Sequence, residues 1–147
     1  MVPLPHDQSA GPDASMAETI AALQAQRIAT KAIIELSDRF DRTVGIGVWG
    51  NLGPTIVRWE ESKNPVTTNL RTGFVLPTLK SATGLLFSAY LPKETVIAAL
   101  KAEFSLLDLP RGAALSALEQ VEPALDLIRK NQIAILPCTT AFQNVYR

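Results

Sequence analysis

The stretch LPTLKSATGLLFSAYLP, residues 76–92, decides the fold because it changes from an extended segment into an apolar helix within a few residues. We predict the helix over residues 79–90. Ser81 is suited to cap it, since a serine hydroxyl accepts hydrogen bonds from N–H groups of the first turn. The small residues that follow Ser81 leave the other first-turn N–H groups sterically open, so the helix start can receive an anion. The same pattern also fits a capped core helix that binds nothing.

Two strands are predicted upstream of this stretch. Residues 44–49 alternate glycine with large apolar residues, which is typical of a strand whose glycine face is closely covered. Residues 55–60 form the second strand, and the Gly-Asn-Leu-Gly-Pro turn at 50–54 joins the two as an antiparallel hairpin. Residues 66–70 are predicted to form a third, mostly polar strand.

A long helix is predicted before the hairpin, over residues 15–41. Ser15 is its expected N-cap, and Glu18 completes a capping box. A helix this long in a small domain is either a wall of the core or a linker and dimer element. The first 14 residues contain three prolines and are expected to be a flexible arm, which leaves residues 15–147 as a single domain.

Further helices are predicted downstream. One starts near Pro92 with its apolar residues on one face, and another spans residues 113–130, interrupted or restarted at Pro123. Residues 133–136 are predicted to form a late strand. Strands, then helices, then a returning strand indicate an α+β domain in which helices cover an antiparallel sheet.

Charge and hydropathy exclude several classes of function. The formal net charge is zero and lysines and arginines do not cluster, which argues against binding of DNA or an anionic membrane by this chain alone. No apolar run approaches the roughly 20 residues that span a bilayer. The N-terminus has no secretory signal pattern, so a cytoplasmic protein is expected.

Catalysis and metal binding are not expected. His6 is the only histidine and Cys138 the only cysteine, so a Ser-His-Asp triad, a Cys-His pair within the fold and a thiolate metal cluster are all excluded. Glu60 and Glu61 are adjacent in a strand and point to opposite faces, which does not make an acid/base pair. We therefore expect no enzyme, no metal and no cofactor. Trp49 and Trp59 are either core or interface residues or part of a pocket for an aromatic ligand.

Several motifs together resemble a known family. The chain resembles the effector-binding domain of isocitrate-lyase-regulator-type (IclR-type) transcription factors over residues 20–135. The motifs that carry the resemblance, in the same order, are residues 44–54 (VGIGVWGNLGP), 57–62 (VRWEES), Leu76-Pro77, 81–84 (SATG) and 89–92 (AYLP).

The resemblance implies a GAF-like sensor domain that binds a small organic acid and signals to a DNA-binding domain. Ser81, Ala82 and Thr83 correspond to the positions whose backbone N–H groups meet the carboxylate of the ligand, and Leu76 to an apolar wall. It also implies a homo-oligomer.

The chain departs from the family pattern at both ends. Family members usually begin with a winged helix-turn-helix, whereas only the short arm precedes Ser15, so DNA would be reached only through a DNA-binding domain that this chain lacks. The likeness is lost after Leu136, and the domain is expected to be incomplete there. The alternative function is a non-sensing oligomerisation fragment that pairs with full-length regulators.

Overall fold

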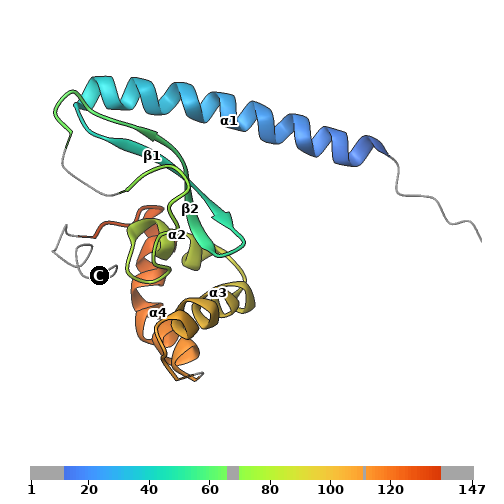
Figure 1. Cartoon of the computed structure of the whole chain (residues 1–147), viewed down its shortest axis with the longest axis vertical. Coiled ribbons are helices and arrows are strands. Elements are labelled where there is room, and N and C mark those ends of the chain that lie inside the picture. Colours follow the sequence, from blue (N-terminus) through green and yellow to red (C-terminus); the bar gives the residue numbers. More distant parts are fainter. Residues whose placement is uncertain (1–11, 66–69, 111, 137–147) are drawn as a thin grey trace, which may run out of the picture. The chain divides into compact units, whose positions relative to one another are not determined.

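The computed structural model describes residues 12–65, 70–110 and 112–136, with side chains from residue 24 onward. Four helices and a two-stranded antiparallel sheet confirm the α+β class (Figure 1). The elements in chain order are α1 (Pro12–Phe40), β1 (Val44–Gly50), β2 (Gly53–Glu60), α2 (Ala82–Tyr90), α3 (Lys93–Leu106) and α4 (Ala113–Asn131).

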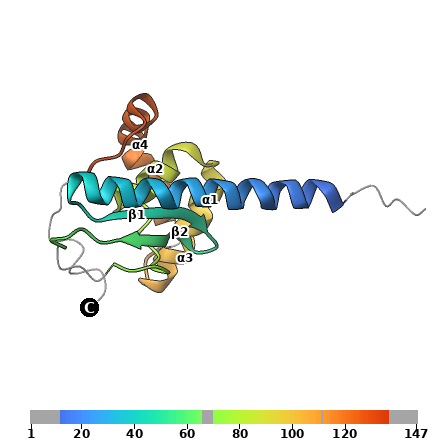
Figure 2. The same ribbon diagram turned by 90° about the horizontal axis from the view of Figure 1, so that it is seen from above.

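The described residues form two compact units. The first contains α1 and the segment from residue 60 to 65; the second contains the rest of the hairpin and the chain from residue 70 onward. Figure 2 shows α1 as one uninterrupted helix. It begins at Pro12, three residues before the predicted N-cap Ser15, because proline at a first helical position gives up no hydrogen bond. Of the predicted arm, residues 12–14 are thus helical and residues 1–11 lie outside the described part.

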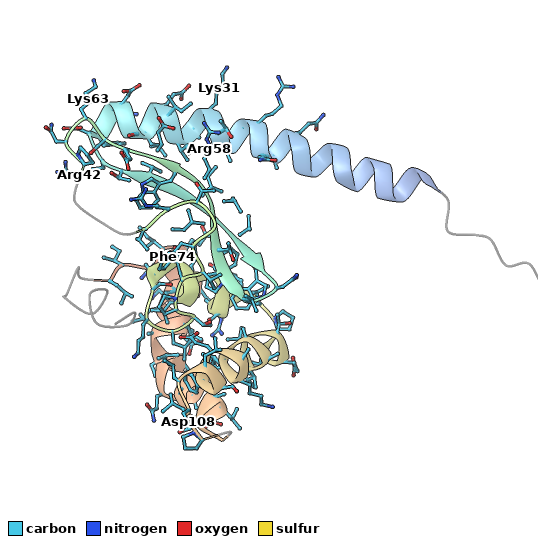
Figure 3. All side chains as sticks on the ribbon, in the orientation of Figure 1. Lys31, Arg42, Arg58, Lys63, Phe74 and Asp108 are labelled. Carbon is cyan, nitrogen blue, oxygen red and sulfur yellow. The ribbon has the colours of Figure 1, made fainter. Side chains whose placement is uncertain are left out.

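Asp41 organises the first unit at the end of α1. Its carboxylate accepts hydrogen bonds from the N–H of Lys63 (3.0 Å) and from Nδ2 of Asn64 (2.9 Å), and its backbone is left-handed, with φ 46°. The Asn64 side chain is the main cause that holds the pKa of Asp41 below its usual value. Nζ of Lys63, which is labelled in Figure 3, also lies 4.0 Å from Oδ1 of Asp38 near the end of α1.

The hairpin is joined by Asn51 and Leu52, and β2 starts at Gly53, two residues earlier than predicted. A segment at 73–76 runs antiparallel beside β2. Its hydrogen bonds join Ile56 N–H to Phe74 O (2.9 Å), Gly73 N–H to Ile56 O (2.6 Å) and Leu76 N–H to Pro54 O (2.7 Å).

The third strand predicted at 66–70 lies almost wholly outside the described residues. Residues 66–69 lie outside the described part, and Leu70 is not in a strand. The extended segment that enters α2 takes the place beside β2, with a single bridge between Thr55 and Val75.

The glycine face of β1 is closely covered, as its alternation predicted. A Cβ atom at Gly45 would lie 3.1 Å from the Trp59 ring, and one at Gly47 would lie 2.8 Å from Cγ2 of Thr83 in α2. Trp49 meets Phe87 of α2 edge to face, with ring centroids 5.8 Å apart. The sheet therefore packs directly on the first turns of α2.

The main apolar core lies among α2, α3 and α4. The predicted start of α3 is confirmed, since Pro92 precedes its first residue. The core is formed by eight buried side chains, which are Leu85, Ala89, Val96, Leu100, Ala114, Leu118, Leu125 and Ile128.

Two predictions for the C-terminal part are wrong. The helix is not interrupted at Pro123: α4 continues through it, because its buried residues on both sides, Leu118 and Leu125, pack on the same core. Residues 133–136 form no strand, and Ile133 and Ile135 are 57% and 79% exposed. A strand needs a neighbour for its N–H and C=O groups, and no described segment pairs with this one.

Candidate functional site

The start of α2 is built around Ser81, which the structure confirms as the N-cap. Its extended backbone (φ −124°, ψ 147°) leads into the helix at Ala82, and its hydroxyl accepts a hydrogen bond from the N–H of Gly84 at 2.9 Å. The same hydroxyl donates to Pro77 O at 2.8 Å. Ser81 is only 2% exposed, so both bonds are inside the protein. The predicted helix at 79–90 is thereby shortened to 82–90.

Gly84 allows the helix start to sit against the turn before it. A Cβ atom at this position would lie 2.7 Å from Pro77 O and closer still to Thr78 O. Real Cβ atoms do not approach carbonyl oxygens that closely, so only glycine fits here. Gly84 is one of the small residues expected to leave the helix start open to an anion, and it is therefore also required for packing.

The first-turn N–H groups divide into used and unused donors. Gly84 donates to Ser81 Oγ, and Leu85 donates to Ser81 O at 2.9 Å. Within the described residues, no acceptor bonds the N–H of Ala82 or Thr83, and both residues are half-buried. Two donors at the positive end of the helix dipole therefore remain for a ligand or water.

Leu76, the apolar residue of the expected site, lies outside the helix start and offers no free N–H donor. Leu76 is 6% exposed, and its N–H donates to Pro54 O near the start of β2. Ser81, Ala82 and Thr83 are brought together simply because they are consecutive. The side of Thr83 that faces the sheet is filled by its own contact with Gly47.

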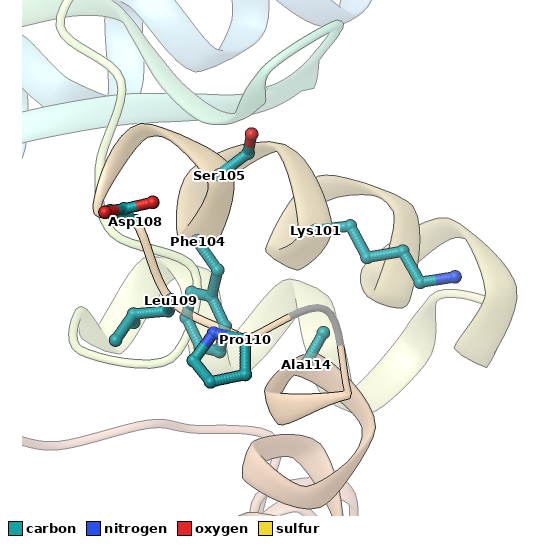
Figure 4. A pocket seen from close by; sticks show the side chains of 7 residues that line it. All are labelled: Lys101, Phe104, Ser105, Asp108, Leu109, Pro110 and Ala114. Atoms are coloured by element: carbon teal, nitrogen blue, oxygen red, sulfur yellow. The ribbon is translucent and has the colours of Figure 1, made fainter.

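Two hollows are lined by other residues. One, of about 640 Å³, lies between the end of α3 and the start of α4, and Figure 4 shows its lining side chains. The other, of about 480 Å³, lies between the hairpin turn and α3 and is lined by Trp49, Asn51, Thr95 and three alanines. Neither is lined by the four residues expected to bind the ligand.

Thr78 is a buried polar residue that sequence reasoning missed. It is 1% exposed; its N–H donates to Glu103 Oε2 at 3.0 Å, while its hydroxyl has no hydrogen-bond partner among the described residues. A threonine between proline and leucine carries no local signal of such burial. The contact with Glu103 joins residues 25 positions apart and follows from the tertiary fold alone.

Other kinds of site have no support in the described residues. In that part of the chain no group of three or more histidines, cysteines or acidic residues lies close enough to hold a metal ion. His6 and Cys138 lie outside it. No helix in the described part is long and apolar enough to cross a membrane.

Comparison with known proteins finds a likeness among solved structures. No family model matches the chain, and no curated protein matches it. Among solved structures, HmgR of Pseudomonas aeruginosa matches with 32% identity and a TM-score of 0.51, over 76% of this chain and 46% of HmgR. The chain thus spans less than half of HmgR. Because HmgR is a regulator, the likeness is consistent with a regulator-related domain and does not indicate an enzyme.

Proposed function

We propose that the chain is the small-molecule sensing domain of an IclR-type transcription regulator, with a GAF-like fold. A small organic acid binds with its carboxylate at the start of α2. The observation that carries this proposal is the pair of unused N–H groups of Ala82 and Thr83, held in place by the Ser81 cap. DNA is reached through a DNA-binding domain of the regulator, and the protein acts in the cytoplasm.

The N–H groups of Ala82 and Thr83 serve mainly to orient the acid, because they supply a minor part of its binding free energy. Contacts of an anion with a helix start contribute about 0.3–1 kcal/mol each, and about 2 kcal/mol when partly buried. A micromolar dissociation constant corresponds to about 8 kcal/mol, so apolar contacts supply most of the affinity. Buried Leu76 is the apolar wall that the proposal assigns.

The Ala82→Pro variant tests the site. Proline at this first helical position removes one N–H donor without breaking the helix, and the extended backbone of Ser81 is what a residue before proline requires. We expect the acid to bind about tenfold more weakly, because a hydrogen bond to a charged group is worth about 1.5–3 kcal/mol. The matched control, Ala82→Ser, keeps the N–H and should bind as the wild type does.

The ligand is found first by thermal melts with short 2-oxo acids and aromatic carboxylates, and its affinity is then measured by calorimetry. A ligand at a hundredfold excess over its dissociation constant should stabilise the fold by about 2.7 kcal/mol. A folded chain that no acid of the panel stabilises would count against sensing. An acid that binds wild type and Ala82→Pro equally would count against the α2 site.

A second candidate function is association without sensing, in which the chain pairs with itself or with full-length regulators. The observation that favours it is the exposure of large apolar side chains on α1: Ile28 is 72%, Leu36 42% and Phe40 57% exposed. Co-expression with tagged HmgR tests pairing with a full-length relative. Failure to recover a mixed oligomer would argue against that form of association.

A further inference from the structure

The hollow between the hairpin turn and α3, both in the second unit, is bounded by an indole ring and a flat helix face. Its four residues on α3 share one face of that helix, since they follow the first at three, four and seven positions. These residues, all with short side chains, are Thr95, Ala98, Ala99 and Ala102. Trp49 of β1 lines the hollow as well, and its ring meets Phe87 of α2 edge to face. A planar ring fits a space of this shape and of about 480 Å³.

The polar groups of this hollow are few and uncharged. None of the seven residues that line it is acidic or basic. The Thr95 hydroxyl, the Asn51 side-chain amide and the Trp49 indole N–H form no hydrogen bond with any described residue. They are therefore left for a ligand or water. A charged group placed here would lose water without gaining an opposite charge, so the lining favours an uncharged ligand.

We infer that this hollow binds a planar, uncharged aromatic molecule that carries an amide or hydroxyl group. Its ring packs against the Trp49 indole and the alanine methyl groups, and its polar group bonds the free groups of Thr95 and Asn51. The contact of Trp49 with Phe87 holds the indole in place before the ligand arrives, which lowers the entropy cost of binding. The inference goes beyond acid sensing and does not depend on it, because none of the four residues expected to bind the acid lines this hollow.

Benzamide and benzoate are the probes, because they are both planar and similar in size but differ in charge. The readout is the indole N–H signal of Trp49 in proton–nitrogen correlation NMR spectra of the full chain. The chain has two tryptophans, so Trp59→Phe identifies this signal. We expect benzamide to shift it in a saturable way. Benzoate should bind here at least about tenfold more weakly, because its carboxylate meets no cation in the hollow.

Two alanine-to-leucine variants test the location. Ala98→Leu fills the hollow and keeps α3, since Ala98 is exposed and leucine is a good helix former. Ala124→Leu is the matched control, because Ala124 is an exposed alanine of α4 that lines neither hollow. Benzamide should bind at least about tenfold more weakly to Ala98→Leu, whose added side chain occupies the space of the ring, and equally well to Ala124→Leu. Circular dichroism checks that each variant is folded.

The polar contact has its own variant. Thr95→Val keeps the shape of the side chain and removes its hydroxyl, so benzamide should bind about threefold more weakly or worse. Undiminished binding to Thr95→Val would overturn the hydrogen bond assigned to this hydroxyl.

The Ala82→Pro variant separates this hollow from the acid site proposed at α2. Benzamide should shift the Trp49 signal equally in wild type and in Ala82→Pro, and the comparison with benzoate is repeated in Ala82→Pro so that acid bound at α2 contributes less. A Trp49 signal that benzamide leaves unmoved throughout its soluble range would overturn the inference. Equal binding of benzoate would overturn the uncharged class, and an undiminished shift in Ala98→Leu would place the ring elsewhere. Failure of acid sensing alone would leave this site standing.

Discussion

At the scale of single residues, a substitution at Gly84 tests how closely α2 packs against the turn that precedes it. Alanine favours a helix over glycine by about 1 kcal/mol, but here its Cβ would be forced against Pro77 O and Thr78 O. We expect Gly84→Ala to destabilise the protein by about 1–3 kcal/mol in urea unfolding, since overpacking costs that much. Gly112→Ala is the control, because nothing lies within 4 Å of its added Cβ. Equal stability of the two variants would contradict the close approach at Gly84.

The pKa of Asp41 can be used to test the hydrogen bond that its carboxylate accepts from Asn64. Because the folded state lowers this pKa, Asp41 adds stability above its unfolded value near 3.8, and that contribution is lost as pH falls through the folded pKa. Removing the largest cause, in Asn64→Ala, should raise the pKa of Asp41 toward 3.8 in an NMR titration. Lys63→Gln should leave it lowered, because the bond from Lys63 comes from the backbone N–H. An unchanged pKa in Asn64→Ala would exclude the bond in solution.

At the scale of elements, the contact between β1 and α2 can be measured as a coupling. Gly47→Ala adds a Cβ 2.8 Å from Cγ2 of Thr83 and should cost about 1–2 kcal/mol. Thr83→Ser deletes that Cγ2, so Gly47→Ala should cost little in the Thr83→Ser background. The difference between the two costs is the coupling energy of a double-mutant cycle, measured by denaturant unfolding. Additive effects would mean that strand and helix do not meet at these residues.

The elements also show which features a sequence can predict. The Ser81 cap was predictable because its hydrogen bond with Gly84 joins residues that are close in sequence. The hairpin was predictable because the residues of its turn are also close in sequence. The continuity of α4 through Pro123 depends on burial against distant helices. The absence of a strand at 133–136 depends on whether another segment pairs with it. The packing role of Gly84 could not be predicted for the same reason, since its restriction comes from the Pro77–Thr78 turn and not from the helix.

At the scale of the whole molecule, burial is unevenly distributed between α1 and the helical core. Between residues 24 and 40 of α1 only Ile33 and Ser37 are buried, whereas α4 buries four apolar or small residues over its length. Amide hydrogens in well-buried elements exchange slowly, since their exposure requires more global opening. Hydrogen exchange followed by mass spectrometry should therefore show stronger protection in α4 than in α1 at low protein concentration. Equal protection would mean that α1 is as strongly held as the core.

Protein concentration then links exchange in α1 to its pairing. If the exposed apolar side chains of α1 pair with a second copy, raising the concentration should slow exchange around Leu36 and leave α4 unchanged, because mass action favours only the state in which α1 is covered. Leu36→Asn should reduce this dependence, because Leu36 is one of the exposed apolar side chains of α1. Concentration-independent exchange in α1 of a chain that still dimerises would place the interface elsewhere. Acid binding that stabilises α2 without changing α1 would show that sensing and pairing reside in separate parts of the chain.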